Sequence, residues 1–413
     1  MPEIDKIHEG SVITFKWRGR ELKGIVLGVK DKYVSVKLES GYNIMVVPDK
    51  IIYARENGQI ETKQRETPGE SGKGREISII STGGTIVSKV DYKTGAVFPS
   101  LDIREITSKF QYLERQFRLN TIPFLNILSE NMEPEQWVEL ARKIREESKK
   151  SEGIVISHGT DTMTYTASAL SFLLKEQSVP IIMVGSQRSS DRPSTDSYLN
   201  MEGAINFAST DFGEVGISMH SSISDAGIYL LRGVRARKMH SSRRDAFRPI
   251  GEKPVGYFQD GLVNMTGKYR KKGERTEIFE KIEKRAGILY FYPGMEIDDM
   301  ASFMERKMGI VIMGTGLGHI STKFIDLLKE YTDSGRLAVM TTQCINGPSD
   351  LNVYSTGRQL IKAGVTWAGN LLPEAAVAKM MVVMANYPDF EWSRRMVSNV
   401  RGEILEREEL EAF

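Results

Sequence analysis

The chain has 413 residues, of which 40% are hydrophobic and 27% charged, with a formal net charge of +2. These values are typical of a soluble globular protein of about two or three domains, and the small net charge leaves any contact with nucleic acid to a local patch. The single cysteine, Cys344, excludes an internal disulfide, and no run approaches the roughly 20 apolar residues of a membrane helix. MPEIDKIHEG, residues 1–10, lacks the apolar region of a secretory signal, so we expect a reducing, cytoplasmic location.

Residues 1–56 form the first predicted unit. The segments SVITFKW, ELKGIVLGV, KYVSVKLES and YNIMVVP are rich in β-branched and aromatic residues, and turn-like RGR, KDK and SG separate them. Short, closely spaced strands of this kind predict a small, SH3-like β-barrel. The next residues, 57–76, contain a single aliphatic side chain, Ile60, and many charges, and are predicted to be a linker.

After the linker, short apolar runs alternate with helical patterns. The runs are EISII, GIVIS, VPIIMVG, GIVIMG and RLAVMTT, and the helical segments include EQWVELARKIREES and ISTKFIDLLKEYTDSG. The alternation predicts βαβ units with a parallel sheet, and the continuous apolar runs predict strands covered on both faces. A charged stretch near residues 270–288 divides this α/β body into two predicted domains, 77–270 and 289–413.

Small polar residues follow several of the apolar runs. STGGT, residues 81–85, follows the first run, SHGTD, residues 157–161, follows the second, and GSQ, residues 185–187, follows the third. Ligands of open α/β sheets bind at the carboxyl ends of the strands. We therefore expect Thr85, Thr160 and Asp161 to meet in one crevice.

Two chemistries compete for the glycine-rich segment STGGTIVSK. A phosphate-binding loop needs a lysine at a fixed spacing after its glycines, and that lysine is absent; GTGLGH, residues 314–319, also lacks the dinucleotide-binding spacing. A threonine nucleophile instead needs an acid and a group that moves its proton, and Asp161 stands beside Thr160. The five histidines lack zinc-ligand spacing, and a backbone contact explains His158 at least as well as catalysis does.

TGGTI, residues 82–86, and HGTDTM, residues 158–163, together resemble the signature segments of the asparaginase family of amidohydrolases. The likeness runs from about residue 75 to the C-terminus and includes VGSQRSSDRPSTD. The resemblance implies an asparaginase-like, two-domain parallel-sheet body. It also implies hydrolysis of the side-chain amide of asparagine or glutamine through an acyl-enzyme.

Matching the family position by position implies four catalytic residues. Thr85 corresponds to the attacking threonine, and Thr160 and Asp161 correspond to the second threonine and its acid. Lys238, in RKMHSSRRDAF, corresponds to the lysine that relays protons. The sequence leaves open which threonine carries the acyl group.

The same resemblance implies residues that bind the substrate. Ser129 and Glu130 correspond to the segment that binds the amino-acid head group, and the backbone at Gly84 and Gly159 would stabilise the oxyanion. Gly95-Ala96 replaces the family tyrosine on the loop after TGGTI, and Tyr92 is the candidate substitute. No metal is implied.

The N-terminal unit extends the resemblance over nearly the whole chain. Together with VDYKTGAVFPSLD, SENMEPEQW and TTQCINGPSDLNVYSTGRQL, it is similar to the D subunits of archaeal glutamyl-tRNA(Gln) amidotransferases. This likeness implies a protein that releases ammonia from glutamine or asparagine and has no cofactor of its own. It further implies a ligase complex, a heterotetramer around a homodimer of D subunits. The E subunit of the amidotransferase, as the partner, would use ATP and Mg²⁺ to activate Glu-tRNA(Gln) for conversion to Gln-tRNA(Gln).

Two alternatives remain from the sequence. One is a free-standing L-asparaginase with an accessory β-barrel, and the other is a non-catalytic α/β protein that binds a nucleotide.

The basic stretch RGVRARKMHSSRRDAFR, residues 232–248, has seven Lys or Arg residues. It either faces tRNA phosphates or supplies surface charge around Lys238, and we favour surface charge. The barrel is compatible with binding RNA or protein.

Overall fold

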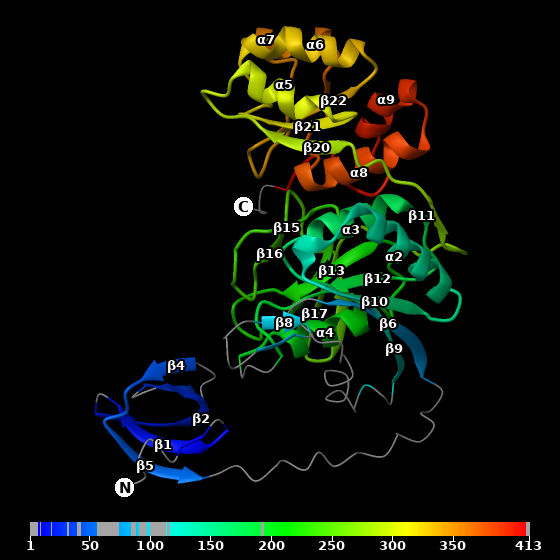
Figure 1. Cartoon of the computed structure of the whole chain (residues 1–413). Helices are drawn as coiled ribbons and strands as arrows, with labels where there is room; N and C mark the ends of the chain where they lie inside the picture. Colours follow the sequence, from blue (N-terminus) through cyan, green and yellow to red (C-terminus); the bar gives the residue numbers. More distant parts are fainter. Residues whose placement is uncertain are drawn as a thin grey trace.

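The computed structural model describes residues 7–8, 10–17, 19–30, 33–38, 43–55, 74–83, 88–90, 97–99, 113, 116–190 and 194–409. Figure 1 shows a small N-terminal unit with a five-stranded sheet and an α/β body whose two main sheets have eight and four strands. Most of the predicted linker, residues 57–73, lies outside the described residues. None of the described helices is both long and apolar enough to cross a membrane.

The N-terminal sheet has five antiparallel strands in the order β4-β3-β2-β1-β5. Their bounds are β1 Val12–Trp17, β2 Arg20–Lys30, β3 Tyr33–Leu38, β4 Asn43–Val46 and β5 Lys50–Arg55. The edge strands β4 and β5 are joined by residues 47–49 alone, which span at most about 14 Å, whereas a flat five-stranded sheet is about 19 Å wide. The sheet must therefore curl into the predicted small barrel. Its core contains Ile13, Phe15 and Val34.

The sequence analysis did not identify β5. The register between β1 and β5 pairs Thr14 with Tyr53 and Phe15 with Ile51, so Ile52 is the extra residue of a β-bulge. Ile52 and Tyr53 are both exposed, which breaks the alternation expected of a half-buried strand.

The larger body sheet has eight strands in the order β18-β17-β14-β13-β12-β10-β6-β9. The parallel strands are β6 Arg75–Gly83, β9 Phe117–Ile127, β10 Gly153–Ser157, β12 Ile181–Val184 and β13 Val215–His220, and the antiparallel strands are β14 Ile228–Arg232, β17 Gly256–Gln259 and β18 Leu262–Met265. Every residue of β10 and β12 is buried, as the continuous apolar runs predict. β6 begins at Arg75, inside the predicted linker, because pairing with β9 extends the strand beyond its apolar part.

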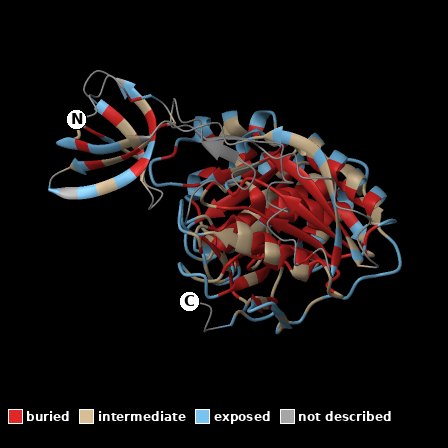
Figure 2. Ribbon diagram, turned by 90° about the horizontal axis from the view of Figure 1, so that it is seen from below, coloured by how far each residue is buried: buried red, intermediate tan, exposed pale blue. Residues whose placement is uncertain are grey.

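Helices cover both faces of this sheet. Ile154 and Ile156 of β10 share a core with α2 (Pro134–Glu147) and α3 (Met163–Leu173), while Val155 shares a core with α4 (Ser197–Phe207). Because neighbouring side chains of a strand point to opposite faces, α4 lies on the face opposite α2 and α3, as Figure 1 shows. In Figure 2 the buried residues concentrate in the strands between these helices.

The second body sheet is entirely parallel and has the order β20-β21-β22-β23. One face packs against α5, α6 and α7, and the other packs against α8, which also contacts α3. Thus α8 lies between the two body sheets. The bounds are β20 Ala286–Tyr290, β21 Gly309–Gly314, β22 Leu337–Thr342, β23 Thr366–Trp367, α5 Ile297–Glu305, α6 Ile325–Asp333, α7 Ser355–Lys362, α8 Pro373–Asn386 and α9 Trp392–Val397. The 3-10 helices are η5 Ser129–Asn131, η6 Thr322–Phe324 and η7 Asp389–Glu391.

Three short strand pairs complete the described elements. They are β7 Ser88–Val90 with β8 Val97–Pro99, β11 Leu174–Glu176 with β19 Glu277–Ile278, and β15 Ala236–Lys238 with β16 Phe247–Pro249. The β15–β16 hairpin places Lys238 at the edge of the first body sheet, next to the start of α3, as the contacts of Lys238 below establish.

Candidate active site

Four adjacent parallel strands of the first body sheet end along one edge. In the sheet order they are β9, β6, β10 and β12, and they are followed by residues 128–132, 84–87, 158–161 and 185–188. Ser157 of β10 pairs with Ser81 of β6, and Gly83 pairs with Ile127 of β9. This edge is the carboxyl end of the strands, where open α/β sheets bind ligands. The described segments after β9, β10 and β12 lie at this edge, while the meeting of Thr85 with Thr160 and Asp161 stays a prediction because residues 84–87 lie outside the described residues.

The turn after β10 is positioned by a buried histidine. The Nδ1–H of His158 donates to the carbonyl of Gly159 over 2.7 Å, and the Thr166 hydroxyl donates to Nε2 over 2.9 Å. Trp137 donates to the Thr166 hydroxyl oxygen over 3.0 Å. Burial lowers the pKa of His158 from 6.5 to about 4, so the ring is neutral at pH 7. These contacts confirm the interpretation of His158 as a backbone-bound histidine.

Gly159 lies directly against the turn that contains Ser129. A Cβ on Gly159 would lie 2.6 Å from Ser129 Cβ and 2.7 Å from Ser129 Oγ. The Thr162 hydroxyl donates to the Ser129 carbonyl over 2.6 Å and fixes the two segments together. Ser129 is buried, whereas Glu130, the next residue of η5, is exposed. The structure thus brings Ser129 to Gly159 and leaves the Glu130 side chain on the surface beside them.

Lys238 reaches the same turn from the β15–β16 hairpin. Its Nζ donates to Thr160 Oγ1 over 2.9 Å and to Asp161 Oδ1 over 2.6 Å. The Lys238 side chain is 13% exposed and that of Asp161 is 69% exposed. Because Lys238 donates to Thr160 Oγ1, the hydroxyl hydrogen of Thr160 is free to point towards another oxygen. This constellation joins a hydroxyl, an amine and a carboxylate, which is the set needed to move a proton.

Thr85, Gly84 and Tyr92 lie outside the described residues, so their predicted roles stay predictions. Gly83, the last residue of β6, is described and has a positive φ of 106°. A Cβ there would lie 2.4 Å from the Ile127 carbonyl oxygen. The first glycine of TGGTI is therefore required by the backbone conformation and by its close contact with β9.

The basic stretch 232–248 is largely occupied by contacts within the chain. Arg235 is fully buried and donates to the carbonyls of Ile250 and Asn370. The other cations each contact an acid: Arg232 contacts Glu214 and Glu252, Arg237 contacts Glu374, Lys238 contacts Asp161, Arg243 and Arg248 contact Asp245, and Arg244 contacts Asp225. These contacts favour an intramolecular role over a free cationic surface for tRNA.

The sequence analysis did not identify two buried residues behind Thr160. Asp196 accepts the backbone N–H groups of Gln187 and Arg188, and Asn200 donates to the carbonyl of Gly185. A Cβ on Gly185 would lie 2.8 Å from Thr160 Cγ2, so the segment after β12 directly supports Thr160. The only sequence signal was the position of Asp196 at the end of VGSQRSSDRPSTD.

Solved structures share this fold. The thermostable L-asparaginase from Thermococcus kodakarensis superposes with a TM-score of 0.74 at 28% identity, covering 80% of this chain and 99% of that chain. L-asparaginase I from Vibrio cholerae superposes with a TM-score of 0.70 at 26% identity, covering 80% and 99%.

Sequence families agree with these structures. Residues 76–270 match the family Asparaginase, N-terminal, and residues 285–397 match the Glutaminase/Asparaginase C-terminal domain. The fold is that of an asparaginase-type protein. The glutamyl-tRNA(Gln) amidotransferase D subunit of Thermoplasma volcanium is 46% identical, covering 95% of this chain and 96% of the relative, and that of Saccharolobus islandicus is 42% identical, covering 98% and 95%. The chain belongs to the family of glutamyl-tRNA(Gln) amidotransferase D subunits.

Proposed function

We propose that this chain is the ammonia-generating component of a tRNA-dependent amidotransferase and hydrolyses the side-chain amide of glutamine or asparagine. One observation carries the proposal: Lys238 Nζ contacts both Thr160 Oγ1 at 2.9 Å and Asp161 Oδ1 at 2.6 Å, at the carboxyl edge of the first body sheet. The relatives named as D subunits, which cover 95% or more of the chain, support the assignment to the amidotransferase.

In the proposed reaction, Thr85 Oγ forms a bond to the amide carbon, and the carbon–nitrogen bond breaks. The hydroxyl proton of Thr85 ends on the departing nitrogen, which leaves as ammonia. Water then attacks the acyl-enzyme, returns a proton to the Thr85 oxygen and releases the acid. Thr160 and Lys238 relay the proton between Thr85 and the departing nitrogen, while the Asp161 carboxylate, 2.6 Å from Lys238 Nζ, stabilises positive charge on the lysine.

The neighbouring residues bind and orient the substrate in this proposal. Ser129 and Glu130 bind the amino-acid head group, and backbone N–H groups at Gly84 and Gly159 stabilise the oxyanion. The close contact of Gly159 with Ser129 supports these separate roles in head-group binding and oxyanion stabilisation. The contact fixes the distance between the bound head group and the reacting amide. Tyr92 is the proposed auxiliary residue.

The released ammonia passes to a partner, the amidotransferase E subunit, in the proposed complex. That partner binds ATP and Mg²⁺, activates the glutamyl group of Glu-tRNA(Gln) and forms Gln-tRNA(Gln), so the complex acts as a ligase in the cytoplasm. A homodimer of this chain would form its centre within a heterotetramer. The words glutamyl-tRNA(Gln) amidotransferase and subunit in the names of the relatives support a complex that acts on tRNA.

A free-standing L-asparaginase is the second candidate function. The superposition on L-asparaginases, which extends over 99% of their chains, favours it. That similarity covers 80% of this chain, however, whereas the D-subunit relatives cover 95% or more. The main proposal accounts for more of the molecule.

The amide transfer itself provides the test. The full-length chain is incubated with glutamine labelled with ¹⁵N in the side-chain amide, alone and then with the E subunit, ATP, Mg²⁺ and Glu-tRNA(Gln). We expect label in Gln-tRNA(Gln) with the complete mixture, and loss of that label with Thr85→Val. Thr266→Val, at an exposed threonine after β18, is the matched control and should transfer label normally. Rapid hydrolysis by the chain alone, unchanged by the partner and without labelled Gln-tRNA(Gln), would favour the free asparaginase.

A further inference from the structure

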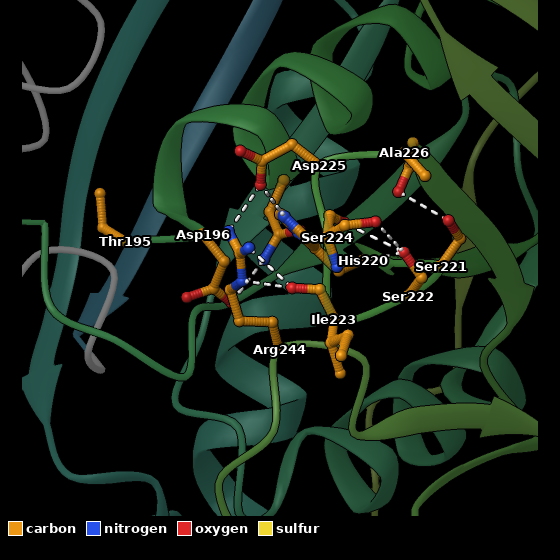
Figure 3. A network of polar contacts seen from close by, with 12 residues as sticks. Thr195, Asp196, His220, Ser221, Ser222, Ile223, Ser224, Asp225, Ala226 and Arg244 are labelled. Atoms are coloured by element: carbon orange, nitrogen blue, oxygen red, sulfur yellow. Dashed lines mark hydrogen bonds and ion pairs between the residues drawn. The ribbon is translucent and has the colours of Figure 1, made fainter. Parts of the chain in front are cut away.

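A continuous set of polar contacts runs behind the Thr160–Lys238 pair. Figure 3 shows Asp196, His220, Asp225 and Arg244 converging, with the loop 221–226 folded around Asp225. The set links the segment that supports Thr160 to the hairpin that carries Lys238. Neither end of the set contacts Lys238 Nζ itself, so any effect on the reaction would be exerted through position.

The buried end of the set is fixed by Asn200 of α4. Its Nδ2 donates to the carbonyl of Gly185 over 2.9 Å and to Asp196 Oδ2 over 3.0 Å. Both partners only accept hydrogen bonds, so the amide cannot be reversed. Its Oδ1 must therefore face His220 Nδ1, which lies at 2.6 Å and carries the hydrogen. Gly185, held in this way, packs directly against Thr160.

His220 connects this buried end to the surface. It is fully buried at the end of β13, and its Nε2 lies 3.2 Å from Asp225 Oδ1. The Asp225 side chain is 69% exposed, yet the same oxygen also accepts from Arg244 Nη1 over 2.5 Å. With the hydrogen on Nδ1, Nε2 donates to Asp225 only when the ring is protonated, so Arg244 is the partner that holds Asp225 in both states of His220.

Arg244 connects the loop 221–226 to the β15–β16 hairpin through hydrogen bonds. Besides its contact with Asp225, its Nε and Nη2 donate to the carbonyl of Ile223 over 3.1 and 2.7 Å. Arg244 lies between β15 and β16, six residues after Lys238. A second arginine, Arg248, donates to the carbonyl of Ser221 over 3.1 Å and is itself paired with Asp245. The hairpin is therefore attached to the loop at more than one point, with Arg244 making the most contacts.

We infer that Arg244 and Asp225 are positioning residues, which set the β15–β16 hairpin so that Lys238 reaches Thr160 and Asp161. This inference rests on the proposed function, because it assigns a role in moving protons to Lys238. The fork of Arg244 fixes direction as well as distance, which a single contact does not. The Arg244 side chain is 15% exposed and that of Asp225 is 69% exposed, so water reaches the carboxylate side of the ion pair, and loss of the pair should displace the hairpin without unfolding the chain.

The test compares turnover in the complex of the full-length chain with the E subunit and Glu-tRNA(Gln). Arg244→Met removes all three contacts and should lower kcat about 10- to 100-fold, because small displacements of a catalytic group have effects of this size. KM for the amide substrate should stay within about two-fold, since Arg244 does not belong to the substrate-binding turn. Arg244→Lys retains a charge for Asp225 but not the fork, and should lose less than Arg244→Met does.

A double variant and a control separate positioning from general damage. Asp225→Asn combined with Arg244→Met should lower kcat no further than Arg244→Met alone, because both remove the same link. Arg275→Met removes an exposed arginine that pairs with Glu277 on the β11–β19 sheet, and should turn over normally. The thermal midpoint is measured for every variant.

The outcomes distinguish this inference from the proposed function. If Lys238→Met turns over normally, the role of Lys238 and the proposed function both fail. If Lys238→Met is inactive and Arg244→Met keeps kcat within about two-fold of the parent, the positioning inference alone fails. If Arg244→Met unfolds, Asp225→Asn decides by the same criterion, since its exposed side chain tolerates substitution.

Discussion

Two lysines in the body are paired with acids, but their surroundings differ. Lys379 of α8 is 2% exposed and donates to Glu403 Oε1 at 2.6 Å, to the Met396 carbonyl at 2.9 Å and to the Ser398 carbonyl at 2.5 Å. Lys238 is 13% exposed and donates to a hydroxyl and to Asp161, whose side chain is 69% exposed.

The difference separates a structural lysine from a reactive one. The three N–H groups of Lys379 have three acceptors, and its partner Glu403 is fully buried, so neither can exchange a proton with a ligand. Burial lowers the pKa of the Lys379 ammonium, and Glu403 opposes that change. Lys238 instead has one N–H without an assigned acceptor among these contacts and a hydroxyl beside it. An ion pair alone therefore does not identify a candidate catalytic lysine. The feature that distinguishes Lys238 is an N–H group left over for a ligand, next to the hydroxyl of Thr160.

The largest expected effect is at Lys238. Lys238→Met keeps the length of the side chain and removes the amine, so kcat for amide hydrolysis should fall about 10²- to 10⁴-fold. The free energy of unfolding should fall by about 1 kcal/mol, because the exposed Asp161 can be solvated whereas the buried Thr160 loses one hydrogen bond. Lys271→Met, which removes an exposed lysine paired with Asp211, is the matched control for both measurements. A large loss of stability in Lys238→Met would break the comparison.

The converse is expected at Lys379. Lys379→Met leaves Glu403 buried without its cation and should lower the free energy of unfolding by about 3–5 kcal/mol in a urea titration. Turnover per folded molecule should be unchanged. Adding Glu403→Gln should recover much of the stability, because the uncompensated charge is then gone. A Lys379→Met variant of normal stability would show that the saturated pair is not structural.

The buried His158 predicts how the free energy of unfolding depends on pH, and it is a further group with a structural role. Its pKa is about 4 in the folded chain and 6.5 when unfolded, so the unfolded state binds more protons between these values. Stability is therefore retained above pH 6.5 and lost as pH falls towards 4, by about 3 kcal/mol. Urea titrations from pH 7.5 to pH 4 measure this loss, and His158→Gln should remove about that much of the slope. His240→Gln, at an exposed position, should keep the slope of the parent.

The smallest expected effect is at Gly159. Gly159→Ala places a Cβ 2.6 Å from Ser129 Cβ, so the two turns must separate. Amide hydrolysis should fall about 10- to 100-fold, with a raised KM because the head-group turn moves. Gly28→Ala is the control, since a Cβ there meets nothing within 4 Å. Equal kinetics for the two variants would show that the contact with Ser129 is unimportant.

The sequence predicted those features that depend on local pattern. Continuous apolar runs located β10 and β12, and the polar residues directly after them located Thr160 and Asp161. The bulged strand β5 was not predicted, because two consecutive exposed residues, Ile52 and Tyr53, break the alternation that identifies a half-buried strand.

Features that depend on distant pairing required more than local pattern. Lys238 lies 77 residues after Asp161 and carries no local motif, so only the family resemblance selected it from the other lysines. In the basic stretch, sequence spacing does not reveal that Arg235 points into the core or that Arg244 is committed to Asp225. Asn200 and Asp196 likewise became visible only once α4 and β13 were placed side by side.

The position of α8 has a consequence for dividing the molecule. By sequence it belongs to the second half of the body, yet its residues Ala376, Met380 and Val383 share a core with Leu170 of α3 as well as with Val311 of β21. A fragment that stops between residues 270 and 285 would expose the apolar side of α3 to water. The two halves of the body should therefore not fold as separate expression fragments, and they should unfold in a single calorimetric transition. The N-terminal barrel has a hydrophobic core of its own, so its removal should leave the core of the body intact.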